Sequence, residues 1–339
     1  MKGRILVPGG AGYIGSHTVY ALIESGAEVV IIDNLETGFK GALHPEALFY
    51  EGDIRDESFL EKVFENENID GVIHFAANSL VGESMTNPLK YYNNNIGGTR
   101  CLLEAIVKHE VDKIVFSSTA ATYGEPEILP ITEDAKTQPG NCYGETKLAM
   151  EKMFRWSELA HGIKYVSLRY FNACGAHENG IIGEAHNPET HLIPLVLQVP
   201  NGKREHVSVF GNDYPTRDGT CVRDYIHVSD LADAHILAMK YLFENGKSEI
   251  FNLGNGVGFT VREVLKAAEK ATGQGISYKD MPRRDGDPAQ LVASSEKAKK
   301  ILGWCPKRDD LEYIVASAWK WHRAHPEGYG KAEGNNGNM

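Results

Sequence analysis

The sequence predicts an α/β protein built on a doubly wound parallel sheet, with a smaller C-terminal region interleaved with it. Short runs rich in β-branched residues alternate with amphipathic stretches through the first half of the chain. Most of these runs are apolar on both faces, which is typical of parallel strands that helices cover on both sides. After Asn172 a long segment rich in Gly, His and Pro interrupts the alternation.

The expected elements follow in order along the chain. We expect strands at residues 4–7, 28–32, 71–75, 113–117 and 165–169. Between and after them, helical periodicity predicts helices at residues 13–25, 58–66, 95–109 and 143–161. Two later stretches, 229–243 and 249–253, again have the patterns of a helix and a strand. We therefore expect the chain to return to its first domain before a final region closes over it.

Composition and charge exclude several classes of protein. The 339 residues suffice for one large or two modest domains with real cores. Lys and Arg number 35 against 46 Asp and Glu, and the net charge of −11 gives no basic field for a nucleic acid. No apolar run approaches the ~18 residues that span a bilayer. The absence of a signal-peptide pattern predicts a cytoplasmic protein.

A metal ion is not expected from the sequence. The five cysteines are widely spread and form no Cys-x-x-Cys pair, and no His-Glu-x-x-His motif is present. His186 and His191 lie in a Pro-containing loop rather than one helical turn apart, so their spacing does not indicate a metal site.

A glycine-rich motif follows the first expected strand. Gly9, Gly12 and Gly15 have a spacing that lets the backbone turn tightly, approach a pyrophosphate and pack a helix on the sheet. Asp33 ends the second strand, where its carboxylate can bind the adenosine ribose hydroxyls and would repel a 2′-phosphate. These features predict a Rossmann-type domain that binds NAD rather than NADP. The strand before the motif and the acidic residue after it disfavour a merely structural turn.

The expected domains follow from this motif and from the returning segments. Residues 1–172, with returning segments near 225–253, are assigned to an NAD-binding domain. Residues 173–330 are assigned mainly to a substrate-binding domain. The tail, 331–339, is rich in Gly and Asn and is expected to be flexible.

Tyr143 and Lys147 form a Tyr-x-x-x-Lys pair on one face of an expected helix. A tyrosine is a poor base at neutral pH because its pKa is about 10, and a nearby ammonium can lower that pKa. Such a pair alone usually marks a solvated helix face. The glycine motif, and Thr119 just after an expected strand, favour a catalytic role.

The chain resembles the extended short-chain dehydrogenase/reductase family, and within it the UDP-sugar 4-epimerases, over nearly its whole length. The segments that carry this resemblance are residues 9–17 (GGAGYIGSH), 75–77 (FAA), 81–84 (VGES), 143–147 (YGETK), 168–172 (LRYFN), 210–214 (FGNDY), 222–228 (VRDYIHV) and 325–329 (HPEGY).

The resemblance implies an NAD-dependent isomerase that interconverts UDP-galactose and UDP-glucose. The sugar is oxidised at C4, the 4-keto sugar rotates about its bond to the diphosphate, and it is then reduced on its other face. Tyr143 would take the proton from the 4-hydroxyl, and Thr119 would hydrogen-bond the 4-oxygen. Lys147 would lower the pKa of Tyr143 and hold the nicotinamide ribose.

The resemblance also assigns residues to the two ligands. For NAD these are Gly9, Gly12, Tyr13, Ile14, Gly15, Asp33, Asn34, Asp53, Ile54, Phe75, Ala76, Asn94, Ser117, Tyr143, Lys147, Tyr170 and Phe171. For the UDP-hexose they are Thr119, Asn172, His191, Leu192, Phe210, Arg223, Arg284, Asp287 and Leu291. Two arginines suit a diphosphate because guanidinium forks match its oxygens, although a single arginine is more often a solvated surface residue.

The chain departs from the family pattern at three positions. Ser79 stands where many relatives carry a lysine near the NAD pyrophosphate, which removes one charge-assisted contact. His191 replaces a substrate-contacting asparagine. Leu291 stands where many members have a tyrosine beside the sugar's 2-position, and its smaller side chain leaves volume for an N-acetyl group. We therefore hypothesise that UDP-N-acetylglucosamine and UDP-N-acetylgalactosamine are also interconverted.

Two other functions are open to the same fold. A nucleotide-sugar 4,6-dehydratase or decarboxylase needs an acid and a base beside the keto sugar, which the family's dehydratases supply as Asp-Glu after the Thr. Here Ala120 and Ala121 follow Thr119 and cannot move a proton. A non-catalytic NAD-binding protein would be expected to lose the Tyr/Lys pair or the Thr, and all three are present. The resemblance also implies a homodimer through helices 95–109 and 143–161.

Overall fold

The computed structural model describes residues 1–284 and 287–330. Its main layer is a seven-stranded sheet in which every strand is parallel to its neighbours. Its strands, in sheet order, are β11 (Glu249–Asn252), β6 (Lys164–Arg169), β5 (Lys113–Ser117), β4 (Gly71–His74), β1 (Arg4–Pro8), β2 (Glu28–Asp33) and β3 (Leu48–Glu51). The expected α/β class is therefore confirmed, and the expected tail 331–339 lies outside the described residues.

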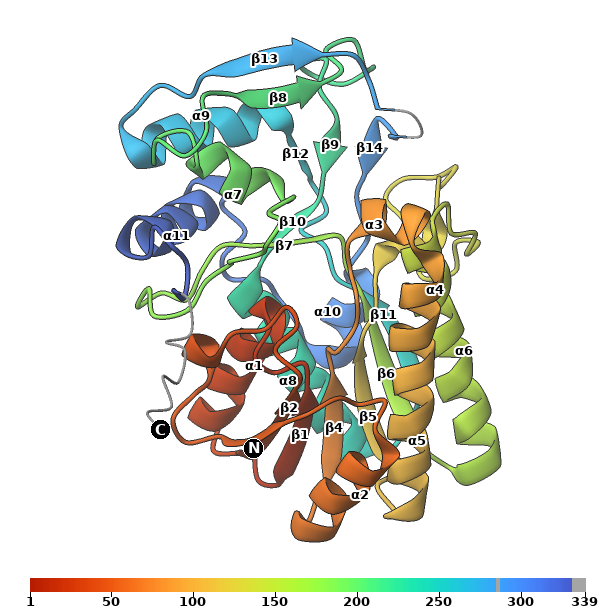
Figure 1. Ribbon diagram of the computed structural model, residues 1–339. Coiled ribbons are helices and arrows are strands. Elements are labelled where there is room, and N and C mark those ends of the chain that lie inside the picture. Colours follow the sequence, from red (N-terminus) through yellow and green to blue (C-terminus); the bar gives the residue numbers. More distant parts are fainter. Residues whose placement is uncertain (285–286, 331–339) are drawn as a thin grey trace, which may run out of the picture.

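Helices cover both faces of this sheet (Figure 1). One face carries α1 (Tyr13–Glu24), α8 (Val228–Asn245) and α10 (Glu296–Leu302), and the other carries α2 (Glu57–Asn66), α5 (Gly98–Lys108) and α6 (Cys142–His161). Strand β1 shows why both faces need covering. Ile5 and Val7 belong to the first apolar core, on the side of α1 and α8, and Leu6 belongs to the second, on the side of α2, α5 and α6. Period-2 alternation buries both faces of each central strand.

A smaller region lies beyond the carboxyl edge of the sheet, at the top of Figure 1. Its strands form three short sheets, made of β7 (Asn172–Cys174) with β10 (Tyr225–His227), β8 (Val207–Phe210) with β13 (Tyr278–Met281), and β9 (Val222–Arg223) between β12 (Phe259–Thr260) and β14 (Gln290–Leu291). The helices α7 (Leu192–Leu197), α9 (Val261–Thr272) and α11 (Leu311–Ala324) share a third apolar core with β8.

The order of the strands fixes where a ligand can bind. The chain runs from β1 outward through β2 to β3, and then crosses to β4 on the other side of β1. Ligands of open parallel sheets bind at such a reversal, beyond the carboxyl ends of the strands. The glycine motif follows β1 at this point. Strand β11 pairs with β6, so the chain does return to the main sheet after leaving it. The exact domain boundaries stay a prediction.

Two features differ from the sequence prediction. Strand β3 was not predicted, because it is a half-exposed edge strand of four residues with too little apolar pattern to stand out. The helix expected at residues 95–109 begins earlier, as α4 (Pro88–Tyr91), and passes through a π-helical segment η2 (Tyr92–Gly97) before α5. Pro88 starts this helix, and the polar residues of η2 hide its periodicity.

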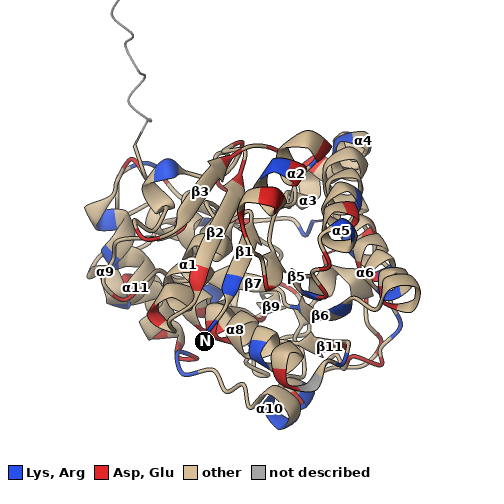
Figure 2. Cartoon of the chain, turned by 90° about the horizontal axis from the view of Figure 1, so that it is seen from below, with Lys and Arg blue, Asp and Glu red and all other residues tan. Residues whose placement is uncertain are grey.

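The remaining short elements connect these layers. They are η1 (Lys40–Ala42), α3 (Val81–Thr86) and η3 (Ala120–Tyr123). Figure 2 shows acidic and basic residues interspersed along α5 and α6. Arg100, for example, is paired with Glu57 and Glu104 at 2.8 and 2.5 Å. Among the described residues, no helix has both the length and the apolar character needed to cross a membrane.

A buried ion pair joins α6 to β6. The Arg169 guanidinium donates to both carboxylate oxygens of Glu151 at 2.9 and 2.5 Å, and both side chains are 4 % exposed. Ser118 donates to the same carboxylate at 2.5 Å, and the ring of Tyr123 lies 4.8 Å from the guanidinium carbon. The pair is therefore fully enclosed by hydrogen-bonding and aromatic groups.

We expect Glu151→Gln to destabilise the fold by about 3–5 kcal/mol, because it leaves the Arg169 charge buried without its counter-ion. The matched control is Glu158→Gln on the same helix, whose pair with Lys164 is partly exposed and should change stability by less than about 1 kcal/mol. Urea unfolding followed by circular dichroism measures both. Equal losses for the two variants would contradict this account of the pair.

Candidate active site

The turn after β1, here called the glycine turn (residues 9–15), packs so closely against neighbouring backbone that no side chain fits at two of its glycines. A Cβ on Gly9, whose φ is 83°, would lie 2.5 Å from the backbone nitrogen of Ala76. A Cβ on Gly15 would lie 2.1 Å from the carbonyl oxygen of Gly9. The backbone of this turn therefore lies directly against the start of α1 and the end of β4, which leaves its outer side open to a ligand.

The N-terminus of α1 has the character of an anion site. Its N-cap residue, Gly12, provides no side-chain acceptor, and its first turn contains no acidic residue. Five other helices are capped by side chains, those of Asp56, Asn141, His227, Thr260 and Asp310. The N–H groups of Tyr13 and Ile14 are therefore placed to receive a pyrophosphate, as the sequence predicts.

Acidic and amide groups follow at the ends of β2 and β3. The Asp33 carboxylate accepts from the backbone N–H of Ala11 at 3.0 Å and of Leu35 at 2.9 Å, and its burial raises its pKa. Asn34 donates to Asp53 at 3.0 Å, and hydrogen bonds from Arg55 lower the pKa of Asp53 to about 2. The contact of Asp33 with Ala11 places this carboxylate beside the glycine-rich turn.

The middle of the predicted cofactor site joins β4 to the π-helical segment. The backbone N–H groups of Phe75 and Ala76 donate to Pro8 at 2.8 and 2.9 Å. Asn94 is buried and donates to Asn95 at 3.2 Å. Asn95 in turn donates to Thr146 of α6 at 3.0 Å. Ile54 closes this side as part of the second apolar core. The turn, the uncapped helix and the carboxylate at Asp33 together fit an NAD molecule.

The predicted catalytic residues meet at the ends of β5 and α6. Lys147 is 3 % exposed, and its Nζ donates to the Ser117 carbonyl at 2.8 Å. The same Nζ lies 5.9 Å from the centre of the Tyr143 ring. Thr119 makes a side-chain hydrogen bond with Tyr143 that favours the phenolate. These three side chains therefore lie together where β5 ends and α6 begins.

Burial controls the ionisation of this group in the chain alone. It raises the pKa of Tyr143 to about 12, against the opposing hydrogen bond from Thr119, and lowers the pKa of Lys147 to about 7. The lowered tyrosine pKa expected from the Tyr-x-x-x-Lys pair is therefore not present here. The physical reason is that desolvation penalises both charged forms, so the ammonium that should stabilise a phenolate is itself disfavoured.

Aromatic and hydroxyl groups complete this end of the site. The hydroxyls of Ser117 and Tyr170 lie 2.5 Å apart. Phe171 packs, together with Leu291, against a small cluster formed by Ala120, Tyr123 and Ile131. Leu291 thus contacts the segment that begins directly after Thr119, although 172 positions separate the two residues in the sequence.

The predicted UDP-hexose residues gather in the smaller region. Arg223 is hydrogen-bonded and ion-paired with Asp287, and the Arg284 guanidinium carbon lies 3.9 Å from the centre of the Phe210 ring. In the pairing of β9 with β14, Leu291 lies opposite Arg223. Further members are Asn172, which donates to the Asp224 carbonyl at 2.9 Å, and Leu192, which begins α7.

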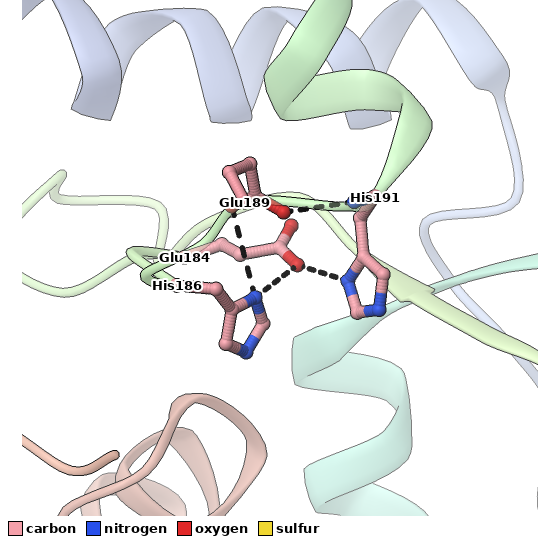
Figure 3. A group of neighbouring side chains, drawn as sticks. All are labelled: Glu184, His186, Glu189 and His191. Atoms are coloured by element: carbon pink, nitrogen blue, oxygen red, sulfur yellow. Dashed lines mark hydrogen bonds and ion pairs between the residues drawn. The ribbon is translucent and has the colours of Figure 1, made fainter. Parts of the chain in front are cut away.

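His191 lies in a different environment from the one its predicted role suggests. Its Nδ1 is hydrogen-bonded to Glu184, which also contacts His186, with Glu189 beside them (Figure 3). Glu184, His186 and Glu189 were not predicted as site residues, because a loop without periodicity brings them together. Glu151 and Arg169 were not predicted either. Glu151 lies two helical turns after Tyr143 on the face that carries Lys147, a spacing that could have revealed it.

Comparison with known proteins agrees with this geometry. Residues 5–254 match the model of the NAD dependent epimerase/dehydratase family. The chain is 59% identical to a UDP-glucose 4-epimerase of Halalkalibacterium halodurans, over 96% of this chain and 97% of the relative. A crystal structure of a UDP-glucose 4-epimerase superposes with a TM-score of 0.96 at 56% identity, covering 97% of this chain and 100% of the other. A crystal structure of UDP-glucose 4-epimerase from Brucella ovis in complex with NAD superposes with a TM-score of 0.92 at 45% identity, covering 94% of this chain and 97% of the other.

The fold and the site define a dinucleotide-binding enzyme with a group of Tyr, Lys and Thr side chains at the carboxyl edge of its sheet. The chain belongs to the NAD-dependent epimerase/dehydratase family, a branch of the extended short-chain dehydrogenases/reductases. Its cofactor is NAD.

We expect Gly15→Ala to weaken NAD binding at least about tenfold, which corresponds to roughly 1.4 kcal/mol. The new methyl group would collide with a backbone atom, the Gly9 carbonyl oxygen, and so displace the turn that receives the pyrophosphate. Gly275→Ala is the matched control, because nothing lies within 4 Å of its Cβ position. NAD released on denaturation, and NAD titration of the stripped protein, measure the effect. Wild-type affinity in Gly15→Ala would contradict the close-approach argument.

Proposed function

We propose that this chain interconverts UDP-galactose and UDP-glucose by inverting the configuration at C4 of the hexose, without net oxidation. The observation that carries the proposal is the meeting of Tyr143, Lys147 and Thr119 at the carboxyl edge of the sheet, beside the glycine turn. The relatives of highest identity reported above bear the name UDP-glucose 4-epimerase, which supports the same substrate pair.

The residues of this chain would act on the proton and the oxygen of the reacting carbinol. NAD, when bound, supplies a reversible two-electron acceptor. Tyr143, as phenolate, accepts the proton of the 4-hydroxyl and later returns it. Thr119 hydrogen-bonds the 4-oxygen in both directions of the reaction. Lys147, in its protonated form, would stabilise the phenolate by its charge, an attraction that has to outweigh the desolvation that lowers the pKa of Lys147.

The nucleotide end of the substrate would be held by the group formed by Arg223, Arg284, Phe210 and Asp287. Two guanidinium groups can bind the diphosphate through paired N–H donors. In the chain alone Arg223 is already neutralised by Asp287, so substrate binding exchanges one charge-assisted contact for another. Phe210 offers a flat apolar face for the uracil ring, and Arg284 covers the opposite side of that aromatic ring.

The alternative reactions lack their chemical groups at the reacting end. A 4,6-dehydratase needs an acid and a base next to the 4-keto sugar. Ala120 and Ala121 occupy those places, and Ala120 is 1 % exposed. A non-catalytic NAD-binding protein gives no reason for a buried lysine beside Tyr143, since burying an ionisable lysine is costly.

We also propose a homodimer and retain the predicted cytoplasmic location. Trp156 and Leu159 on α6 are 68 % and 67 % exposed, and on an isolated chain they form an apolar outer face of that helix. Covering such side chains is the usual reason for helix pairing between subunits. The helices α5 and α6 are the expected contact.

The proposed activity is tested by proton NMR of UDP-galactose mixed with the purified protein, first without and then with added NAD. We expect UDP-glucose to form, and we expect Tyr143→Phe to lower kcat by about 10²–10⁴ because the proton acceptor is lost. Tyr278→Phe, at an exposed strand position, should retain full activity. If the wild-type protein yields no UDP-glucose even with NAD, the proposal is wrong in substrate or in kind.

We further propose that the pocket beside Leu291 accepts an N-acetyl group at the sugar's 2-position. Leu291→Tyr should then lower kcat/KM for UDP-N-acetylgalactosamine by about 10–200-fold while leaving UDP-galactose nearly unchanged, because added volume excludes only the larger sugar. Leu291→Met conserves volume and should affect neither substrate strongly. Initial rates with both sugars measure this ratio. A parallel loss on both sugars, or a wild-type protein inactive on the N-acetylated one, would refute the assignment.

A further inference from the structure

Four potential metal ligands converge in the loop between β7 and α7. They are Glu184, His186, Glu189 and His191, and one ligand atom from each lies within 4.8 Å of all the others (Figure 3). Figure 3 shows the two carboxylates and the two imidazole rings pointing toward a common centre. They come from an eight-residue stretch without regular secondary structure, so no helix or strand geometry forces them to face one another.

The spacing of the four atoms suits a small tetrahedral ion. Bonds of about 2.1 Å from a central Zn²⁺ place tetrahedral ligand atoms about 3.4 Å apart. Nδ1 of His186 lies 3.2 Å from Oε1 of Glu184 and 3.7 Å from Oε2 of Glu189. Nδ1 of His191 is hydrogen-bonded to the same Oε1, and this pair has to separate slightly to admit an ion. Side-chain adjustments alone would therefore complete the coordination.

Neighbouring groups hold the carboxylates in orientation. The backbone N–H groups of Thr190 and His191 both donate to Oε1 of Glu189 at 2.8 Å, which leaves its Oε2 directed toward His186. The Glu184 side chain is 3 % exposed. Its predecessor, Gly183, exchanges two backbone hydrogen bonds with the Tyr329 hydroxyl at 3.0 and 2.9 Å. Such outer contacts are what pre-orient the ligands of metal sites.

The donor set selects the chemical class of the ion. Metal ligation requires both imidazoles in their neutral form, and two carboxylates with two neutral imidazoles then carry a charge of −2, which a divalent cation neutralises in this partly buried cluster. Imidazole ligands favour Zn²⁺ and its transition-metal neighbours over Mg²⁺ and Ca²⁺, which prefer oxygen alone. We propose that Glu184, His186, Glu189 and His191 form a four-ligand structural site for a divalent transition-metal ion, best matched by Zn²⁺.

The position of this site explains what the ion would stabilise. All four ligands come from the protein, as in structural rather than catalytic zinc sites. His191 is the N-cap residue of α7, and the His186 ring lies edge-on to the Tyr13 ring of the glycine turn, 6.0 Å between centres. An ion here would therefore tie α7 to the loop that packs on the glycine turn. The His191 side chain is 50 % exposed and provides the entry route.

The test measures bound metal in the NAD-containing protein purified as a full chain. The protein is stripped with a chelator, and Zn²⁺ is titrated in competition with a chromophoric chelator. Bound metal is then counted by mass spectrometry after gel filtration. His186→Gln and Glu189→Gln each remove one ligand. His206→Gln is the matched control, since His206 lies 3.8 Å from Glu205 in a His–Glu pair outside the site.

We expect one Zn²⁺ per wild-type chain, affinity at least about tenfold weaker in His186→Gln and Glu189→Gln, and wild-type affinity in His206→Gln. At the same Zn²⁺ concentration, the rise in Tm should be larger for the wild-type and control proteins than for the two ligand variants. If His186→Gln does not fold, the Zn²⁺ affinity of Glu189→Gln tests the proposal instead. The visible spectrum of Co²⁺ bound to the wild-type protein is a second measurement, because it distinguishes tetrahedral from octahedral coordination. No saturable binding, unchanged affinity in the ligand variants, or an octahedral Co²⁺ spectrum would overturn the proposal and leave an ion-pair network alone.

Discussion

The buried ion pair between Glu151 and Arg169 determines how α6 lies against the sheet, and the reactive edge depends on that placement. Tyr143, Lys147 and Glu151 follow one another at intervals of four residues, so they share one helix face. Because Glu151 is bound to an arginine of β6, that face is turned toward the ends of β5 and β6. Lys147 then reaches the Ser117 carbonyl at the last residue of β5. An isolated buried lysine would be expensive, but here the nearby carboxylate opposes the desolvation that lowers its pKa.

A second constraint places the cofactor against this face. The glycine turn can lie on β4 only because Gly9 and Gly15 have no side chains, and the same closeness leaves the first N–H groups of α1 available to a pyrophosphate. All strands of the main sheet are parallel, so the direction of the strands alone places the glycine turn, Asp33, Ser117 and Tyr170 at one edge of the sheet. The site is a consequence of strand direction first and of individual side chains second.

Local pattern explains which parts could be predicted. The central strands were predicted within a few residues from their continuous apolar runs, and α1, α2, α6 and α8 from their helical period. Helix α10, seven residues long, was not predicted. The Tyr/Lys pair and the glycine turn could also be predicted, since the residues of each lie within a few positions of one another in the sequence. By contrast, the Arg223–Asp287 pair, the contact of Leu291 with the residues after Thr119, and the group around Glu184 join positions that irregular loops bring together. For the first two, the resemblance to a family supplied residues that periodicity could not. The sequence pattern did not predict the group around Glu184, because its loop has neither a period nor a known ligand spacing.

The distribution of contacts between the two ends of the site bears directly on the proposed inversion. A 4-keto sugar can present its second face only if it rotates while the rest of the molecule stays bound. In the proposed site, the candidate partners of the nucleotide end are charged and aromatic side chains, Arg223, Arg284 and Phe210, which can supply most of the binding energy. At the sugar end the proposed hydrogen bonds, from Thr119 and Tyr143, go to the 4-oxygen alone. Leu291, which packs on an apolar cluster, has no hydrogen-bonding group for the other hydroxyls. Because β14 pairs with β9, Leu291 lies beside Arg223. The distance between the sugar end and the nucleotide end of the proposed site therefore stays constant while the sugar rotates. Firm binding at the nucleotide end, with the hydrogen bonds at the sugar end confined to the 4-oxygen, is the arrangement that permits rotation without release.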